Sequence, residues 1–237
     1  MAHSPSPRSL APPRHTMRPA RLPKSAVPRT YRRIAPTHDT LAVLVEARAR
    51  RLGLTWFGAR DGEILLEVAV GTGLSFQQLL RANPHGWTEG IDLTPAMLRK
   101  AHRRAERAAT DCYRLRQGDA YALDAADDTF DGVLNSYMFD LLPVDDFAPV
   151  LREFKRVLKP GGRLVQMNMT PPERWYQHGW ELLYRLHPAL LGGCRGVRTA
   201  SFLREAGFVN VRRQFVSQWT FPSEVVYGEN PVPEDGA

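Results

Sequence analysis

A glycine turn follows the first long apolar run of the chain. The run 63–70 reads EILLEVAV, and Gly71-Thr72-Gly73 comes directly after it. Glycines at such a point let the backbone pass close to a ligand, and the free N–H groups of a following helix attract an anion. A dinucleotide-binding turn also needs a small residue three positions later, where this chain has Phe76. The turn therefore favours a nucleotide-like ligand without a pyrophosphate over NAD, although similar turns also serve simply as tight strand-to-helix connections.

An acidic residue stands at the separation expected of a ribose ligand. Asp92 ends the stretch 87–92 and lies 19 residues after Gly73. An acid at the end of the second strand of a nucleotide-binding sheet accepts hydrogen bonds from ribose hydroxyls. The alternative is a surface Asp that only begins the turn before Thr94-Pro95, which are typical of a helix start. With the glycine turn in place, we expect Asp92 to bind a ligand.

Strand-like and helix-like segments alternate along the chain and must position these residues. We expect strands over 63–70, 87–92, 113–118, 130–136, 163–168, 208–216 and 219–227, and helices over 39–52, 74–80, 94–109, 145–158 and 199–206. Gly53 and the glycine-containing region 58–62 are expected to end the first helix, and residues 123–129 are too short and acidic for a helix. The alternation predicts an α/β fold: a doubly wound, mostly parallel, seven-stranded, Rossmann-like sheet. Ligands of such sheets bind beyond the carboxyl ends of the strands.

The positive charge of the chain is concentrated in its first residues. The 237 residues carry 32 Lys and Arg against 25 Asp and Glu, a net charge of +7. Residues 1–38 hold eight of the basic residues and no acidic one, which leaves 24 against 25, or −1, for the rest. We therefore expect a basic disordered tail over 1–28, a folded domain over 29–230 and a C-terminal tail over 231–237. Nucleic acid is not expected as a partner of the near-neutral domain.

Several interpretations of the tail stay open. It can be a solvated extension, an electrostatic contact with an anionic membrane or nucleic acid, or an organellar transit peptide, and Met17 can be the true start. A secretory signal is not expected, because the tail has no apolar core segment. Two cysteines are too few for a disulfide framework or a four-cysteine zinc site, so we expect no metal and a cytoplasmic location. No apolar run approaches the roughly 20 residues of a membrane-spanning helix.

Five segments together resemble the class I S-adenosylmethionine-dependent methyltransferases, especially the ubiquinone/menaquinone biosynthesis group. They are ILLEVAVGTGLS (64–75), GIDLTPAMLRKA (90–101), QGDAYAL (117–123), FDGVLNSYMFDLL (130–142) and REFKRVLKPGGRLVQMN (152–168). The resemblance runs from about residue 31 to 227 and is strongest over 63–169. The chain departs from the Gly-x-Gly-x-Gly pattern of the first motif, because Ala69 replaces the first glycine. A positive φ there would strain the turn.

The resemblance implies S-adenosylmethionine as the cofactor and assigns ten positions to its site: Glu67, Ala69, Gly71, Gly73, Asp92, Leu93, Met97, Asp119, Ala120 and Asn135. The carboxylate of Glu67 would approach the amino group of the cofactor, and the backbone of the glycine turn its amino-acid part. Asp92 would accept from both ribose hydroxyls, and Leu93 and Met97 would flank the adenine.

At the adenine edge, Asp119 would accept from the exocyclic amine, with the Ala120 N–H facing the ring. Asn135 would put its carbonyl near the methionyl end of the cofactor, although it can equally be a satisfied turn residue.

The acceptor is expected to be a small apolar or aromatic molecule, such as a quinone precursor, a lipid or a secondary metabolite. In this family the segment after the fifth strand often covers the acceptor pocket, and here residues 171–191 carry four large aromatic residues among leucines. Three of them are spaced four apart, a stripe that is also typical of core packing. The acceptor-site candidates are Tyr31, Tyr137, Trp175 and His178.

No catalytic base is assigned, because Tyr137, Asp140 and His178 each have an ordinary structural explanation. Two other functions stay open. A nucleic-acid methyltransferase could use the basic tail, although Asn135-Ser136-Tyr137-Met138 does not resemble the Asp-Pro-Pro-Tyr tetrad of such enzymes. A non-catalytic module could bind the cofactor as a sensor.

Overall fold

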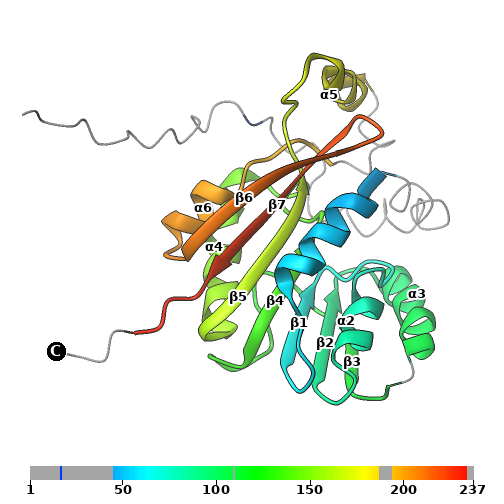
Figure 1. The fold of residues 1–237 in the computed structure, drawn as a ribbon, viewed down its shortest axis with the longest axis vertical. Helices are drawn as coiled ribbons and strands as arrows, with labels where there is room; N and C mark the ends of the chain where they lie inside the picture. The colour runs from blue at the N-terminus through cyan, green and yellow to red at the C-terminus, as the bar shows by residue number, and fades with distance from the viewer. Residues whose placement is uncertain (1–16, 18–44, 109, 187–193, 234–237) are drawn as a thin grey trace, which may run out of the picture.

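A seven-stranded sheet forms the centre of the molecule, and helices lie on both of its faces (Figure 1). The computed structural model describes residue 17 and residues 45–108, 110–186 and 194–233. Apart from residue 17, the predicted tail 1–28 and the start of the predicted domain at 29 lie outside these residues. The strands are β1 (Ile64–Val68), β2 (Trp87–Asp92), β3 (Tyr113–Gln117), β4 (Phe130–Ser136), β5 (Leu158–Met169), β6 (Val209–Gln218) and β7 (Phe221–Glu229).

The strand order β3-β2-β1-β4-β5-β7-β6 confirms the predicted Rossmann-like fold. Strands β1 to β5 pair in parallel, and β7 runs antiparallel to both β5 and β6. The order reverses at β1, which has β2 on one side and β4 on the other. Ligands of open α/β sheets bind at such a switch point, beyond the carboxyl ends of the strands.

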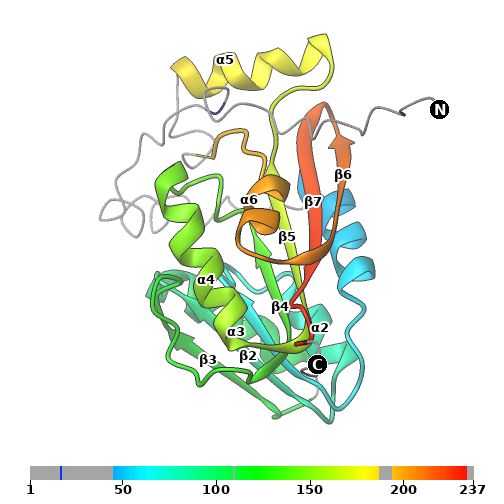
Figure 2. The ribbon, with the colours of Figure 1, turned by 90° about the vertical axis from the view of Figure 1, so that its left-hand side faces the viewer.

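Helices lie on both faces of the sheet, and α5 lies beyond the end of β5 (Figure 2). The helices are α2 (Phe76–Ala82), α3 (Pro95–Ala105) with its extension η3 (Glu106–Ala108), α4 (Phe147–Val157) after η4 (Val144–Asp146), α5 (His178–Leu186) after η5 (Trp175–Gln177), and α6 (Ala200–Glu205). A further helix occupies residues 45–57 of the described chain. Figure 2 shows α4 and α6 on one side of the sheet and the helix of residues 45–57 on the other. No described helix has the length and apolar character needed to cross a bilayer.

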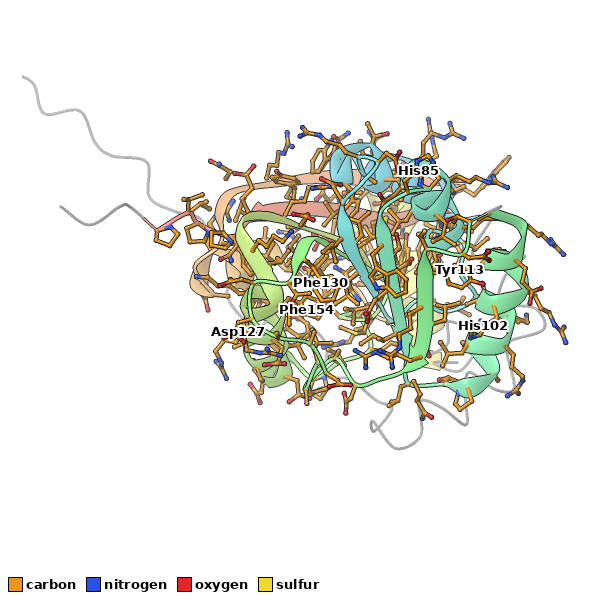
Figure 3. The ribbon with its side chains drawn as sticks, turned by 90° about the horizontal axis from the view of Figure 1, so that it is seen from below. His85, His102, Tyr113, Asp127, Phe130 and Phe154 are labelled. Carbon is orange, nitrogen blue, oxygen red and sulfur yellow. The ribbon has the colours of Figure 1, made fainter. Side chains whose placement is uncertain are left out.

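The core is built from the apolar faces that the sequence predicts. Helix α4 buries Phe147, Val150, Leu151, Phe154 and Val157, spaced along one face. Figure 3 shows Phe130 of β4 and Phe154 of α4 inside the molecule, whereas His102 and Asp127 lie toward its periphery. The prediction of no helix between β3 and β4 is confirmed, since residues 123–129 form none.

Three predicted boundaries are wrong. The break that the sequence places at 217–218 lies at 219–220, because Gln218 pairs with Phe221. The first helix continues through Gly53 to residue 57, and Gly58, with φ +55°, follows it. Gly53 lets the helix pack closely on β5, because a Cβ on it would meet the side chain of Met167. Strand β5 begins at Leu158 rather than 163, because Leu158 already pairs with Phe130 before a shift in register.

Candidate functional site

A cavity lies at the carboxyl ends of β1, β2, β3 and β4. Its walls come from the helix of residues 45–57, the turn after β1, the start of α3, and the segments that follow β3 and β4. The lining residues are Glu46, Arg50, 67–72, Leu74, Ser75, 91–94, Met97, 118–121, 136–138 and 141–143. Segments distant in the sequence therefore meet at the switch point that the strand order predicts.

The turn after β1 contains three residues in the left-handed region. Ala69 has φ +58°, Gly71 +56° and Gly73 +83°. The strain expected at Ala69 is therefore present, and a residue with a Cβ in this region costs about 1–2 kcal/mol. Ala69 and Gly71 line the cavity, but Gly73 does not. The Gly73 N–H donates to Val70 O at 3.0 Å, and an added Cβ would lie 3.0 Å from Ala101 Cα. Gly73 therefore allows α3 to approach the turn.

Asp92 joins the ends of β1 and β2. One carboxylate oxygen accepts from the Gly71 N–H and the other from the Thr94 N–H, both at 2.8 Å. Burial raises the pKa of Asp92, and these two backbone hydrogen bonds oppose the rise. Each carboxylate oxygen can accept a second hydrogen bond. The side chain is thus fixed by the backbone and still has acceptor capacity toward the cavity it lines.

Glu67 is a buried carboxylate with an unsatisfied oxygen. It is 1% exposed and lines the cavity, and its Oε2 has no hydrogen-bond partner. Burial raises the pKa of Glu67 well above its usual value; Arg50 lowers it and Asp92 raises it further. A buried acceptor without a donor is costly, so a ligand with an N–H group would satisfy it.

Asn135 is buried behind the cavity wall rather than exposed to the cavity, where it was predicted to meet the cofactor. Its amide donates to Val68 O at 2.9 Å, and its own Oδ1 has no partner, but the residue is not part of the cavity wall.

The predicted adenine-binding residues lie together on the wall formed by β2, α3 and the segment after β3. Leu93, Met97, Asp119 and Ala120 all line the cavity. Asp119 Oδ1 accepts from the Tyr121 N–H at 3.2 Å. The Tyr121 hydroxyl donates to Asp146 Oδ2 of η4 at 2.6 Å. This wall combines apolar side chains with a fixed carboxylate, which suits a planar heteroaromatic group.

Glu46 and Arg50 line the cavity and were missed by the sequence analysis. They form an ion pair at 3.3 Å, one helical turn apart. Burial raises the pKa of Glu46 to about 7, although Arg50 lowers it. The only local signal is the four-residue spacing, which is typical of an exposed ion pair. In the folded chain the Arg50 charge acts on Glu67 of β1, and the Glu46 charge acts on Tyr137 after β4.

Of the three acceptor-site candidates that the structure describes, only Tyr137 lies in the cavity wall. Tyr137 has φ +50°, and its hydroxyl shares a hydrogen bond of 2.8 Å with Ser223 of β7. Burial raises the pKa of Tyr137 well above its usual value. Trp175 and His178 lie outside the cavity wall, with the Trp175 side chain facing solvent and His178 beside Glu181 at 3.3 Å. Tyr31 lies outside the described residues.

The remaining candidate base, Asp140, is fully buried and is not part of the cavity wall. Its Oδ2 accepts from the Met169 N–H at 3.2 Å, and burial raises its pKa to about 7.

Comparisons with known proteins agree with this geometry. A family model described as a methyltransferase domain matches residues 65–162. A ubiquinone/menaquinone biosynthesis C-methyltransferase from Desulfotalea psychrophila is 33% identical over 186 residues, which cover 70% of this chain and 74% of that protein. A demethylmenaquinone methyltransferase from Tropheryma whipplei is 34% identical over 159 residues, 65% of this chain and 64% of that protein. The chain thus spans less than two thirds of the T. whipplei protein.

The fold recurs in solved structures. The crystal structure of the [4+2]-cyclase SpnF has a TM-score of 0.70 and 18% identity, with 91% of this chain and 98% of that chain covered. At this identity the likeness concerns the fold alone.

Proposed function

Because the chain belongs to the class I S-adenosylmethionine-dependent methyltransferases, in the group of the ubiquinone/menaquinone biosynthesis enzymes, we propose that it methylates a small apolar or aromatic acceptor of the quinone-precursor class. The relatives are named as methyltransferases of demethylmenaquinone and of ubiquinone/menaquinone biosynthesis. These names favour a quinone-class acceptor over nucleic acid and over a sensor without activity. A cytoplasmic location is part of the proposal.

The observation that carries the proposal is the unsatisfied carboxylate oxygen of Glu67 in a cavity that also holds Asp92. S-adenosylmethionine supplies, when bound, a methyl group on a positively charged sulfur. Glu67 would accept from its amino group, Asp92 from its ribose hydroxyls, and Leu93 and Met97 would contact the adenine. The residues present therefore fit the cofactor.

The acceptor end of the cavity is apolar. Met138, Leu141, Leu142 and Pro143 contribute to the wall after β4, beside Tyr137. Such a wall excludes water and holds an apolar ring in place, and fixing two reactants in line supplies several kcal/mol of the barrier to transfer.

Methylation of carbon also requires the loss of a proton. Glu46 lines the cavity, and its pKa of about 7 places it near the value at which a carboxylate serves as a base at neutral pH. We assign it this role as part of the proposal.

Calorimetry tests the cofactor assignment. Asp92→Ala is expected to weaken S-adenosylmethionine binding more than about tenfold, because two fixed acceptors are removed. Asp124→Ala is the matched control, since the side chain of Asp124 is 91% exposed. Equal affinity of the two variants would sink the ribose assignment.

Methyl transfer from labelled cofactor to a demethylated naphthoquinol with an isoprenoid side chain tests the acceptor class. Carbon-bound label in the quinone is expected. Cofactor binding without such transfer, but with label in another class of molecule, would contradict the quinone assignment.

A further inference from the structure

Large apolar side chains are exposed on two neighbouring elements. Trp175 is 85% exposed, Tyr176 38% and Leu182 52%, all on η5 and α5, and Trp219 at the β6–β7 turn is 72% exposed. Figures 1 and 2 show α5 and this turn at the same end of the molecule, the end where β5 runs out toward α5. We call these four residues the tryptophan surface. Soluble domains rarely gather such residues without a partner.

The β6–β7 turn has a strained backbone at its exposed tryptophan. Gln218 pairs with Phe221, so Trp219 and Thr220 form a two-residue loop, with φ +50° and +66°. Such loops favour Asn-Gly, because bulky and β-branched residues fit the left-handed region poorly. Strain of this kind concentrates at functional sites. Since most of Trp219 faces solvent, its burial in the fold does not explain the choice of residue.

Hydrogen bonds and ring packing join η5 and α5 to the β6–β7 turn. Trp180 Nε1 on α5 donates to Thr220 Oγ1 at 3.0 Å, and Gln177 Nε2 on η5 donates to Ser217 Oγ at 3.2 Å. The rings of Trp180 and Phe221 pack edge-to-face at 5.1 Å. The tryptophan surface is therefore held by hydrogen bonds and ring packing on both elements.

The charges beside the tryptophan surface are mainly basic. Arg48 and Arg174 are exposed, and neither forms an ion pair with a described residue. Arg48 Nη1 instead donates to Ser217 O at 3.3 Å, which places it beside the β6–β7 turn. Glu173 pairs with Arg213 at 2.9 Å, and Glu181 lies 3.3 Å from His178, which is charged only when it is protonated.

A chain of aromatic contacts links this surface to the cavity. Tyr137, in the cavity wall, lies 6.4 Å from Phe221 between ring centroids, and Phe221 packs on Trp180. Trp180 in turn holds Thr220 of the turn. The acceptor end of the cavity and the tryptophan surface thus lie on two sides of one aromatic cluster.

We propose that the tryptophan surface docks the protein on the headgroup region of an anionic phospholipid bilayer. Trp and Tyr place an apolar ring and a polar edge at a membrane interface, and arginines beside them attract anionic headgroups. Arg48 and Arg174 supply those charges. Docking on this side would bring the acceptor end of the cavity next to the lipid phase, where an apolar acceptor dissolves. The inference rests on surface observations and does not depend on the proposed reaction.

Co-sedimentation of the full chain with vesicles tests the docking surface. One set of vesicles holds phosphatidylcholine alone, and the other adds phosphatidylglycerol. The double variant Trp175→Gln/Trp219→Asn is expected to bind the anionic vesicles roughly tenfold or more weakly. Asn tolerates the left-handed region, so the turn is expected to fold. The matched control is Trp87→Gln: Trp87 is 40% exposed but begins β2, at the opposite end of the strands.

Each outcome decides the proposal. Support requires that Trp87→Gln bind like the unchanged protein, that brominated lipid quench tryptophan fluorescence less in the double variant, and that the double variant still bind S-adenosylmethionine. Equal vesicle binding by the double variant and the unchanged protein would overturn the proposal and assign membrane contact to the basic tail. Self-association in the absence of lipid that disappears in the double variant would also overturn it, in favour of a protein interface.

Discussion

Gly73 lies where α3 comes closest to the glycine turn, and replacing it separates two physical effects. A Cβ at position 73 meets φ +83° and lies 3.0 Å from Ala101 Cα and 3.2 Å from Ala101 Cβ. Gly62 has a similar φ of +91°, but a Cβ there has nothing within 4 Å. Gly62→Ala therefore measures backbone strain alone, and Gly73→Ala measures the same strain together with the crowding of α3.

The magnitudes follow from these contacts. Left-handed strain costs about 1–2 kcal/mol, and the lower entropy of unfolded Ala offsets about 0.4–1 kcal/mol, so Gly62→Ala is expected to lose about 1 kcal/mol. Crowding against backbone adds about 1–3 kcal/mol, which brings Gly73→Ala to a loss of about 2–4 kcal/mol. Because α3 carries Met97 of the cavity wall, Gly73→Ala is also expected to weaken cofactor binding.

Urea unfolding at constant m-value measures both losses. The two midpoints are expected to differ clearly, with the lower one for Gly73→Ala, and calorimetry is expected to show weaker S-adenosylmethionine binding for that variant alone. If both variants lose the same free energy of unfolding, α3 does not press on the turn, and the explanation given for Gly73 is refuted.

Three further predictions concern buried polar groups. Gln166→Met is expected to raise the free energy of unfolding by about 1–3 kcal/mol in urea, because neither amide atom of Gln166 has a partner among the described residues; a loss would mean that water satisfies the amide. Arg213→Met is expected to cost about 3–5 kcal/mol in the same assay, because it leaves the buried carboxylate of Glu224 unpaired, and a loss near zero would contradict this. For Glu46, whose pKa burial raises from 4.5 to about 7, the protonated form is favoured in the folded state, so stability falls as pH rises through that interval. Glu46→Gln is expected to flatten the fall of Tm with pH only partly, since the pKa of Asp140 is also raised to about 7; an unchanged slope would show that Glu46 does not titrate there.

The sequence predicts most of the fold because strand-like and helix-like segments alternate along the chain. The limits predicted for 87–92 and 130–136 are those of β2 and β4 in the structure, and the mostly apolar run 63–70 contains the buried strand β1. The motif spacing also brings Asp92 and Glu67 to one cavity, since the carboxyl ends of neighbouring parallel strands meet there. Their roles toward the cofactor stay predictions.

Other features depend on contacts between distant parts of the chain. Gly53 reads as the end of a helix, and only the sulfur of Met167 on β5 explains why the helix passes through it. Glu46 reads as half of an exposed ion pair, because the groups that bury it belong to other elements. The sequence places the break before the last strand at 217–218 and Trp219 inside that strand, since Trp-Thr carries none of the residue preferences of a hairpin loop.

The position of β1 in the sheet also bears on how the chain reaches its native state. The β6–β7 hairpin closes over a two-residue loop, whereas Leu65 of β1 must find Gly132 of β4. Hairpins form within microseconds, but distant parallel pairing must first overcome the entropy of closing a long loop. Until that pairing occurs, one edge of an apolar strand is open to other chains. Refolding yield is therefore expected to fall as protein concentration rises, with the joining of β1 and β4 as the slow step.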